Sequence, residues 1–245
     1  MEIVYKKPSV FSPTQPNNFC PGCMHSSAWK VIGEVLDEME LTEKCAWVAG
    51  VGCVANANRC IQLDQFGVPH GRACAAASAF KRCNPDTFLL TYQGDGDLAA
   101  IGLGETISAA NRGDNFTVIF INNGIYGMTG GQMAPTTLLG AKTTTTPFGR
   151  NAEEHGNPIH MCELINTLQA PSYIARVTTA DVPNVRKAKE AVRDAFQHQL
   201  DGKGFSFVEF ISNCPTNWGM TPVESLDYIH DVVLKEYELG VFRNR

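Results

Sequence analysis

The sequence predicts an α/β fold, a doubly wound and mostly parallel sheet with helices on both faces. Short apolar runs rich in β-branched and aromatic residues recur at 87–93, 116–122, 172–178 and 205–212. Segments long enough to form a helix separate them, and this alternation is typical of strand–helix–strand units. The runs are apolar throughout, as expected of parallel strands that are buried on both faces.

The first part of the chain contributes four further elements. Residues 1–19 contain three prolines and predict an extended arm. Residues 26–41 place apolar side chains near helical spacing and predict a helix. Residues 45–53 form a short apolar run that ends in glycines, which predicts a buried strand and a turn. Residues 71–83 are rich in alanine and predict a helix that an Asn-Pro-Asp sequence ends.

The remaining elements connect the strands. Residues 98–112 are long enough for one crossover helix between the strands at 87–93 and 116–122, which makes a right-handed unit. Residues 185–200 predict a helix between the last two strands. Residues 126–160 have no strong period and predict a long loop, and such loops in compact domains are usually functional or disordered.

Composition limits the class of protein. With 245 residues, 44% of them hydrophobic, we expect one large domain over 20–245 that follows the arm at 1–19. The net charge of −5 and the absence of a basic block argue against nucleic acid as a partner. No run approaches the roughly 20 apolar residues that cross a membrane, and the N-terminus has no apolar signal-peptide region. We therefore expect a cytoplasmic protein without a membrane partner.

Nine cysteines are many for such a chain. In a reducing compartment disulfides are a poor explanation, so metal ligation or simple burial is the better one.

Two polar motifs follow neighbouring predicted strands. Gly-Asp-Gly-Asp occupies 94–97, and Asn-Asn-Gly-Ile-Tyr-Gly occupies 122–127. Ligands of open α/β sheets bind beyond the carboxyl ends of strands, so both motifs should face one crevice. Gly94 and Gly96 allow the backbone to approach a ligand, and a helix starting near Leu98 would direct its first N–H groups there. No lysine stands in the loop, so it is not a P-loop.

A cation held by oxygen atoms would meet the negative charge of a phosphate ligand. The Asp95 carboxylate, the Asn123 amide and the backbone carbonyl of Ile125 form the kind of shell that Mg²⁺ prefers, completed by phosphate oxygens and water. The 28-residue separation of Asp95 and Asn123 fits one helix and one strand. The alternative is that an Asp-Gly turn and an Asn-rich turn merely connect neighbouring elements.

The cysteines suggest a second site. Cys20 and Cys23 form a C-x₂-C pair, which suits zinc or an iron–sulfur cluster. Cys53 and Cys214 each follow a predicted strand, so all four could converge at one edge of the sheet. The residues alone leave cluster and zinc open, the zinc alternative being Cys20, Cys23, His25 and one more cysteine. The other five are interpreted as core or surface thiols: Cys45, Cys60, Cys74, Cys83 and Cys162.

With both sites in view, the sequence resembles the thiamine-binding β subunit of the 2-oxoacid:ferredoxin oxidoreductases. The matching pieces run from 19 to about 222 and are CPGC, GVGC, HGRA, TYQGDGDLAAIG, NNGIYGMTGGQMAPTT and NCPTNWG. The resemblance implies the fold that binds the diphosphate half of thiamine diphosphate, and a 4Fe-4S cluster on the same four cysteines. Two departures stand out: Met24 replaces a usual glycine, and VANANRC after Cys53 lacks the Ser or Lys of some relatives.

The resemblance also implies an activity and partners. The activity is oxidative decarboxylation of a 2-oxoacid with coenzyme A, in which electrons pass singly through the cluster to ferredoxin. The implied partners are a pyrimidine-binding α subunit, which would supply the carboxylate that activates the cofactor, with γ and ferredoxin-like δ subunits. At 245 residues the chain has room for the diphosphate half only, so we expect the active site at an interface.

Site residues follow from the matched motifs. His70 and Arg72 in HGRA are expected to meet a substrate carboxylate or cofactor phosphate, although a lone histidine is more often structural. Met128 and Thr129 are expected to line the cofactor pocket, the alternative being an ordered loop without a role. The cofactor-binding residues expected are Gly52, Cys53, His70, Gly94, Asp95, Gly96, Asp97, Asn123, Ile125, Tyr126, Gly127, Met128 and Thr129.

The substrate is the least determined feature. Neither 53–58 nor 123–137 contains Lys or Arg, so nothing there meets a second substrate carboxylate. This favours a branched-chain acid such as 2-oxoisovalerate over 2-oxoglutarate, although a partner chain could supply the charge. Two competing functions use the same residues: a non-oxidative thiamine decarboxylase or synthase subunit, and an electron-transfer or structural subunit with a vestigial thiamine site.

Overall fold

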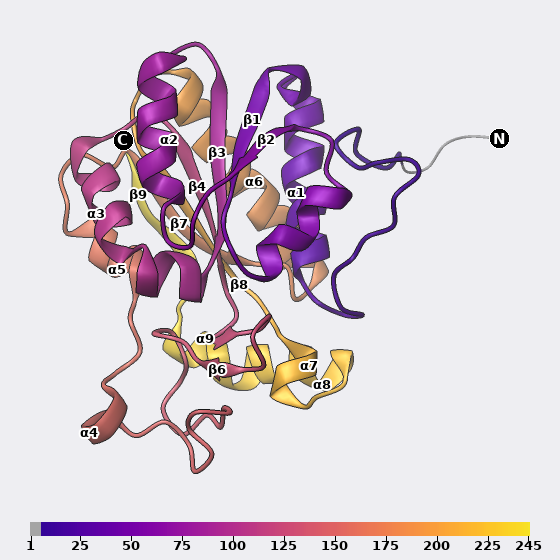
Figure 1. The fold of residues 1–245 in the computed structure, drawn as a ribbon, viewed down its shortest axis with the longest axis vertical. Helices are drawn as coiled ribbons and strands as arrows, with labels where there is room; N and C mark the ends of the chain where they lie inside the picture. Colours follow the sequence, from indigo (N-terminus) through magenta and orange to yellow (C-terminus); the bar gives the residue numbers. More distant parts are fainter. Residues whose placement is uncertain (1–5) are drawn as a thin grey trace.

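A seven-stranded sheet forms the centre of the molecule. The computed structural model describes residues 6–245, and within them the strand order is β2-β1-β3-β4-β8-β7-β9. Every neighbouring pair is parallel except β7 and β9, so the predicted doubly wound, mostly parallel sheet is confirmed (Figure 1). The strands are β1 Cys45–Ala49, β2 Asp64–Gly67, β3 Phe88–Gly94, β4 Thr117–Asn122, β7 Tyr173–Thr178, β8 Ser206–Ile211 and β9 Gly240–Asn244.

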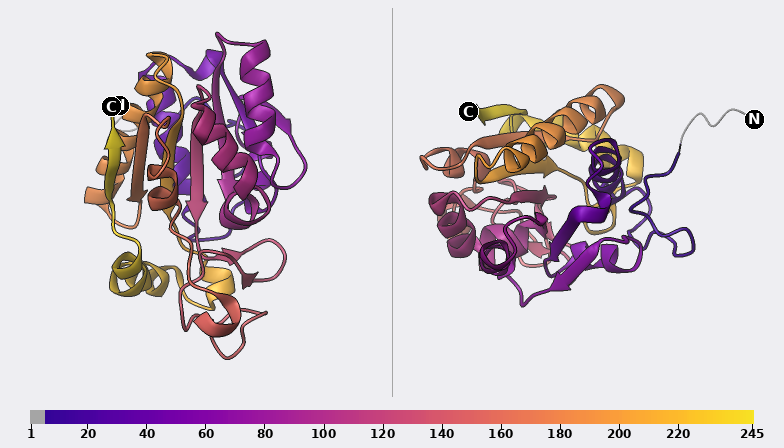
Figure 2. Two further views of the ribbon diagram at one scale, coloured as in Figure 1. Left: turned by 90° about the vertical axis from the view of Figure 1, so that its left-hand side faces the viewer. Right: turned by 90° about the horizontal axis from the view of Figure 1, so that it is seen from above.

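Helices cover both faces of this sheet (Figure 2). On one face α1 (His25–Glu38) and α6 (Val182–Leu200) bury Trp29, Leu36 and Phe196 in one core cluster. The other face carries a second cluster, to which α2 (Ala73–Cys83), α3 (Leu103–Arg112) and α5 (Met161–Asn166) contribute. The central strands are buried on both faces, which explains why their sequences lack alternation.

The crossover between β3 and β4 differs from the single helix that was predicted over 98–112. A π-helical turn at Gly96–Ile101 comes first, and α3 begins only at Leu103. Gly102 separates them, and a Cβ added there would lie 2.6 Å from the carbonyl oxygen of Gly71. The helix is therefore interrupted where the turn that contains Gly71 packs directly against its backbone.

Several short elements have no counterpart in the sequence prediction. Besides the edge strands β2 and β9, the C-terminal region after β8 folds into a group of short helices below the sheet (Figure 1). They are α7 Pro215–Trp218, α8 Pro222–Tyr228, η4 Ile229–Val233 and α9 Leu234–Glu236. The short 3₁₀ turns are η1 Thr42–Lys44 and η2 Cys53–Arg59, the latter at the end of β1.

The N-terminal segment is packed rather than detached where the structure describes it. Val10 is fully buried in the same cluster as α1, and its carbonyl accepts a hydrogen bond of 2.7 Å from the Gln62 amide. Residues 1–5 of the predicted arm lie outside the described residues. The division of the chain into an arm and a domain at residue 19 stays a prediction.

The predicted long loop projects beyond the carboxyl edge of the sheet. It contains the small hairpin β5 Ile125–Tyr126 and β6 Gln132–Met133 and the single turn α4 Ala152–His155. One buried arginine organises much of it, because the Arg150 guanidinium donates to the carbonyls of Pro135 at 2.9 Å and Asn157 at 2.8 Å. A single side chain thus satisfies backbone acceptors that no sheet or helix serves.

Within residues 6–245, none of the helices has the length and apolar character needed to span a bilayer.

A buried ion pair lies in the middle of the sheet. The side chains of Arg176 and Glu209 are both fully buried, and Nε of Arg176 donates to Oε2 of Glu209 at 2.8 Å. Glu209 also accepts a hydrogen bond of 2.7 Å from Asn122, the last residue of β4. The pair therefore holds the carboxyl end of β4, from which the second polar motif of the site continues.

We expect Arg176→Met to lower the free energy of unfolding by about 3–5 kcal/mol, because Glu209 would remain buried without a counter-charge. Urea denaturation followed by circular dichroism measures the change. Arg82→Met is the control, since Arg82 pairs with Asp114 at the surface and should contribute less than about 1 kcal/mol. The double variant Arg176→Met with Glu209→Leu should recover most of the loss, and a double variant no more stable than Arg176→Met would contradict this account.

Candidate functional site

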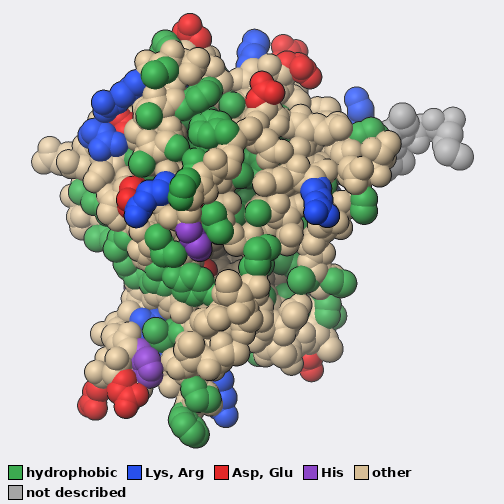
Figure 3. Space-filling view, in the orientation of Figure 1, with side chains coloured by type: hydrophobic (Ala, Val, Ile, Leu, Met, Phe, Trp, Pro, Cys, Tyr) green, Lys and Arg blue, Asp and Glu red, His purple; other side chains and the backbone are tan. Residues whose placement is uncertain are grey.

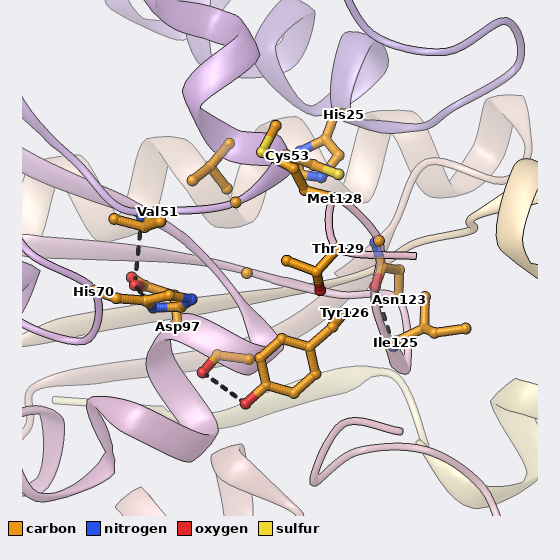
Figure 4. A pocket seen from close by; sticks show the side chains of 15 residues that line it. His25, Val51, Cys53, His70, Asp97, Asn123, Ile125, Tyr126, Met128 and Thr129 are labelled. Carbon is orange, nitrogen blue, oxygen red and sulfur yellow. Dashed lines mark hydrogen bonds and ion pairs between the residues drawn. The ribbon is translucent and has the colours of Figure 1, made fainter. Parts of the chain in front are cut away.

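A cavity opens where β1, β3 and β4 end (Figure 4). Twelve of the thirteen cofactor-binding residues predicted from the sequence line it; Asp95, the exception, is buried at its edge. In the space-filling view a hollow separates the body of the molecule from its lower part, with a largely uncharged rim (Figure 3). The lining residues are His25, Val51, Gly52, Cys53, Val54, His70, Gly94, Gly96, Asp97, Asn123, Ile125, Tyr126, Gly127, Met128 and Thr129.

Asp95 is a buried carboxylate held by the protein's own donors. Its Oδ1 accepts from the Gly96 amide at 2.8 Å, and its Oδ2 accepts from the Ile125 amide at 3.1 Å and the Thr136 hydroxyl at 2.9 Å. Burial nevertheless raises its pKa to about 6, because these neutral donors do not offset the lost hydration. A cation beside Asp95 would supply the missing stabilisation.

The turn after β4 brings the second polar motif to this carboxylate. Gly124 has a φ of +67°, which lets the chain reverse sharply after Asn123. The Ile125 amide then reaches Asp95, and it also lies 3.3 Å from Oδ1 of Asn123. The structure thus brings together two residues that are 28 positions apart, as the sequence predicts for a site with oxygen ligands.

The two glycines of the first motif have different roles. A Cβ at Gly94 would meet no atom within 4 Å, so this backbone faces the open cavity. A Cβ at Gly96 would lie 2.2 Å from the ring of Tyr126, whose hydroxyl donates to the Gly96 carbonyl at 3.3 Å. Gly94 leaves room for a ligand, and Gly96 leaves room for the aromatic wall of the cavity.

Asp97 anchors the turn that carries His70. Its Oδ1 accepts a hydrogen bond from the Gly71 amide at 2.8 Å and lies 2.5 Å from Nδ1 of His70. Its Oδ2 accepts a hydrogen bond from the Gln93 side chain at 2.7 Å. The close-up shows His70 and Asp97 together on one wall (Figure 4). Asp97 is thus engaged by the protein itself, and a direct cofactor contact from it stays a prediction.

Arg72 takes a different direction from His70. It forms an ion pair with Glu105 of α3, its side chain is 48% exposed, and it is not among the lining residues. A contact between Arg72 and substrate or cofactor stays a prediction.

A second cavity brings the four predicted cysteines together. Its lining contains Cys20, Cys23, Cys53 and Cys214. A Cβ at Gly127 would lie 3.0 Å from Sγ of Cys53 and 3.6 Å from Sγ of Cys214, so both sulfurs approach one glycine. The two cavities share one wall, made by His25, Cys53, Asn123 and Gly127.

Asn213 joins the two segments that carry the cysteines. Its side chain accepts from the Met24 amide at 2.9 Å and donates to the Gly22 carbonyl at 3.1 Å, so it fixes the C-x₂-C loop beside Cys214. Met24, which replaces a glycine of the resemblance, has φ −75° and packs into a cluster with Ile211. The backbone there does not require glycine, which explains why the departure is tolerated.

The cysteine cavity disfavours free thiolates. Burial, and to a smaller extent the neighbouring cysteines, raise the pKa of Cys23 to about 12 and that of Cys53 to about 11. Several thiolates can coexist here only with compensating positive charge, as a metal centre would supply.

A zinc ion and an iron–sulfur cluster require different spacings of their cysteine ligands. Four sulfurs on one zinc ion, each at about 2.3 Å, must lie within about 4 Å of one another. Across residues 6–245 no three His, Cys, Asp or Glu side chains converge closely enough to hold a single ion. In a cluster each thiolate binds a different iron, so the ligands can stand further apart. A cluster therefore needs a wider spacing of its four sulfurs than zinc does.

His25 is a feature of the site that sequence reasoning considered only as a zinc ligand. It is buried, stacks on Phe19 with ring centroids 4.9 Å apart, and its Nδ1 lies 2.7 Å from the Tyr92 hydroxyl. Burial lowers its pKa to about 4, so the imidazole is neutral near pH 7. In the sequence, the position of His25 just after the C-x₂-C pair indicates that it lies near the site.

The pKa of Asp95 gives a pH prediction. Because this pKa is raised, protonation stabilises the cation-free fold, and that contribution is complete below about pH 4 and lost as pH rises through about 6. A cation competes with the same proton, so Mg²⁺ affinity should rise about tenfold between pH 5 and 7 and then level off. Titration calorimetry on the native protein and on Asp95→Asn would measure this, and equal affinities of the native protein at the two pH values would contradict the assignment.

Comparisons with known proteins agree with this geometry. Residues 43–210 match the family model described as the C-terminal TPP-binding domain of thiamine pyrophosphate enzymes. The chain is 44% identical over 242 residues to ketoisovalerate oxidoreductase subunit VorA of Methanothermobacter thermautotrophicus, covering 99% of this chain and 50% of that one. It is 37% identical over 206 residues to 2-oxoglutarate synthase subunit KorB of Methanocaldococcus jannaschii, covering 83% of this chain and 72% of that one.

A solved structure agrees over the whole chain. The 2-oxoglutarate:ferredoxin oxidoreductase of Magnetococcus marinus superposes with a TM-score of 0.83 at 25% identity, covering 100% of this chain and 87% of that chain. The sheet topology, the two adjoining cavities and these similarities lead to one conclusion: the chain belongs to the family of thiamine diphosphate-binding β subunits of the 2-oxoacid:ferredoxin oxidoreductases.

Proposed function

We propose that this chain is the cofactor-binding subunit of an oxidoreductase that decarboxylates a 2-oxoacid oxidatively and forms its acyl-CoA. The observation that carries the proposal is the wall shared by the two cavities, to which Cys53, Asn123 and Gly127 contribute. A thiamine site and a redox centre separated by one layer of residues allow electrons to leave singly. A non-oxidative decarboxylase or synthase would have no use for the second cavity.

Thiamine diphosphate and Mg²⁺ would occupy the first cavity. Asp95, Asn123 and the carbonyl of Ile125 would hold the cation, and the open backbone at Gly94 would adjoin the diphosphate. When bound, the thiazolium supplies the carbanion chemistry that decarboxylation requires. The protein's own part is to orient it: Tyr126 packs on Gly96, and Met128 and Thr129 also line the cavity.

A 4Fe-4S cluster would occupy the second cavity on Cys20, Cys23, Cys53 and Cys214. Two observations support it: these four thiols line a single cavity, and burial with mutual repulsion raises the pKa of the inner ones. Asn217 would donate a hydrogen bond to one of the ligand sulfurs, since its Nδ2 lies 3.2 Å from Sγ of Cys214. Hydrogen bonds to ligand sulfurs are among the factors that set cluster potentials.

We propose a branched-chain 2-oxoacid, such as 2-oxoisovalerate, as the substrate. The residues that line the first cavity include neither Lys nor Arg, so they offer no cation to a second carboxylate. The 44% identity to a ketoisovalerate oxidoreductase subunit supports the same choice. 2-Oxoglutarate is the alternative, since it is the substrate named for the KorB relatives and is bound in the M. marinus structure.

The active site would be completed by other chains. The chain spans about half the length of the VorA proteins that it matches, and its relatives are named as subunits. We propose a pyrimidine-binding α subunit, which would bring the activating carboxylate, together with γ and ferredoxin-like δ subunits, and ferredoxin as acceptor. Nine free cysteines suit the reducing cytoplasm.

Activity measured anaerobically on the assembled complex tests this function. Reduction of ferredoxin should require both a 2-oxoacid and coenzyme A, and 2-oxoisovalerate should give a larger kcat/KM than 2-oxoglutarate. A preference for 2-oxoglutarate would overturn the substrate assignment only. Release of CO₂ at an unchanged rate without any electron acceptor would favour the non-oxidative decarboxylase.

Two substitutions should separate the two sites. Asp95→Ala should abolish retention of thiamine diphosphate and leave iron content unchanged, whereas Cys214→Ala should reduce iron and sulfide content. Asp86→Ala and Cys83→Ala are matched controls, because both residues are exposed and precede the amino end of β3, whereas the motifs follow the carboxyl ends of the strands. Normal cofactor retention by Asp95→Ala would refute the cation assignment, and full iron content in Cys214→Ala would move the fourth ligand to another cysteine.

A further inference from the structure

Thr136 contacts the carboxylate at the centre of the proposed cation site. Its side chain is buried, with 1% of the residue exposed, and its hydroxyl donates to Oδ2 of Asp95 at 2.9 Å. Among the described residues this is the one hydrogen bond of that hydroxyl. The Ile125 amide donates to the same oxygen, so two donors from different segments fix the orientation of the Asp95 carboxylate.

Thr136 is in turn held by the C-terminal region. The Tyr237 hydroxyl donates to the Thr136 carbonyl at 2.8 Å, and Tyr237 is 1% exposed. Its ring lies 5.2 Å from the guanidinium of Arg176, the arginine of the buried ion pair in the sheet. A continuous chain of contacts therefore runs from the end of α9 through Thr136 to Asp95.

The geometry points to Thr136 as a positioning residue for the cation site, with Tyr237 holding Thr136 in place. The inference rests on the proposed function, in which Asp95 binds Mg²⁺ with thiamine diphosphate. Thr136 would act through Asp95 without touching the cation. Its hydroxyl keeps Oδ2 occupied and the carboxylate plane fixed, so that Oδ1, which accepts from the Gly96 amide and has further lone-pair capacity, remains available to the cation. The segment Ile229–Tyr237 thereby contributes to cation affinity although it lies outside the cavity lining.

A merely structural threonine would behave differently. Valine has the shape of threonine without its hydroxyl, so Thr136→Val preserves the packing and removes the bond to Asp95. Serine keeps the hydroxyl and loses a methyl group, so Thr136→Ser preserves the bond and changes the packing. If the hydroxyl matters, the valine variant is impaired and the serine variant is not; if packing matters, the order is reversed.

The test measures binding of Mn²⁺, as a probe for Mg²⁺, to the assembled enzyme in the presence of thiamine diphosphate, with free Mn²⁺ counted by electron paramagnetic resonance. Thr136→Val should weaken binding roughly 10- to 100-fold, the usual effect of one hydrogen bond to a charged group. Thr136→Ser should bind as the native enzyme does. Tyr237→Phe should weaken binding by a smaller factor, since it removes the hydrogen bonds to the Thr136 and Ile159 carbonyls and leaves the Thr136 hydroxyl on Asp95.

Thr146→Val is the matched control. Thr146 is a second buried threonine of the same loop, and within residues 6–245 its hydroxyl hydrogen-bonds to the Ala141 carbonyl and the Thr143 hydroxyl and not to Asp95. Its binding of Mn²⁺ should be unchanged. At saturating Mn²⁺ the kcat of Thr136→Val should approach the native value, because the defect lies in cation affinity.

Two results would overturn the inference alone: native affinity in Thr136→Val, or a loss in Thr136→Ser as large as in Thr136→Val. Both variants are also checked for native iron content and for an unchanged urea midpoint. These checks show whether a loss of Mn²⁺ binding comes from misfolding. Absence of Mn²⁺ binding by the native enzyme would instead overturn the proposed function, and this inference with it.

Discussion

The arrangement of the site depends on one constraint: the Asp95 carboxylate is buried away from water at the carboxyl edge of the sheet. Three hydrogen bonds from Gly96, Ile125 and Thr136 hold it, yet its pKa is still raised to about 6. A buried carboxylate with neutral partners only is unfavourable, and a cation bound beside it would offset that cost. The turns after β3 and β4 and part of the long loop are arranged around this one group.

The same edge of the sheet explains why two kinds of chemistry lie side by side. Cys53 and Cys214 follow the ends of β1 and β8 within four residues, and Asp95 and Asn123 directly follow the last residues of β3 and β4. Because parallel strands place all their carboxyl ends at one edge, the cavity beside Asp95 and Asn123 and the cavity lined by the four cysteines become neighbours. Gly127 stands between them, and the absence of a side chain there keeps both sulfurs close to the cavity wall.

Much of this was predictable from local patterns. Buried parallel strands are recognisable in the sequence as apolar runs. The motifs at 94–97 and 122–127 come directly after two such runs, so Asp95 and Asn123 could be paired from their spacing. The four cysteines could be grouped because each lies at a strand end or in a C-x₂-C pair. These features are local in sequence. The parallel sheet brings them together, because the segments that follow its strands all lie at one edge.

What escaped prediction depends on contacts between distant segments. The split of the crossover at Gly102 results from packing against Gly71; glycine at 102 is the local signal, but the contact that requires it comes from a turn about 30 residues earlier in the chain. The short C-terminal helices lack a long period, and the role of Thr136 needs a contact 41 positions away. Arg72 was grouped with His70 by proximity in sequence, but the turn at Gly71 directs the two side chains to different neighbours.

The central claim is that a redox cluster and a thiamine site share one wall. Iron, zinc and acid-labile sulfide content of anaerobically purified protein, with visible spectra before and after dithionite, tests it most directly. The account predicts iron and sulfide near four each per chain, and a colour that bleaches on reduction. Zinc without sulfide would leave the thiamine site in place but remove the path for electrons, and it would contradict the account.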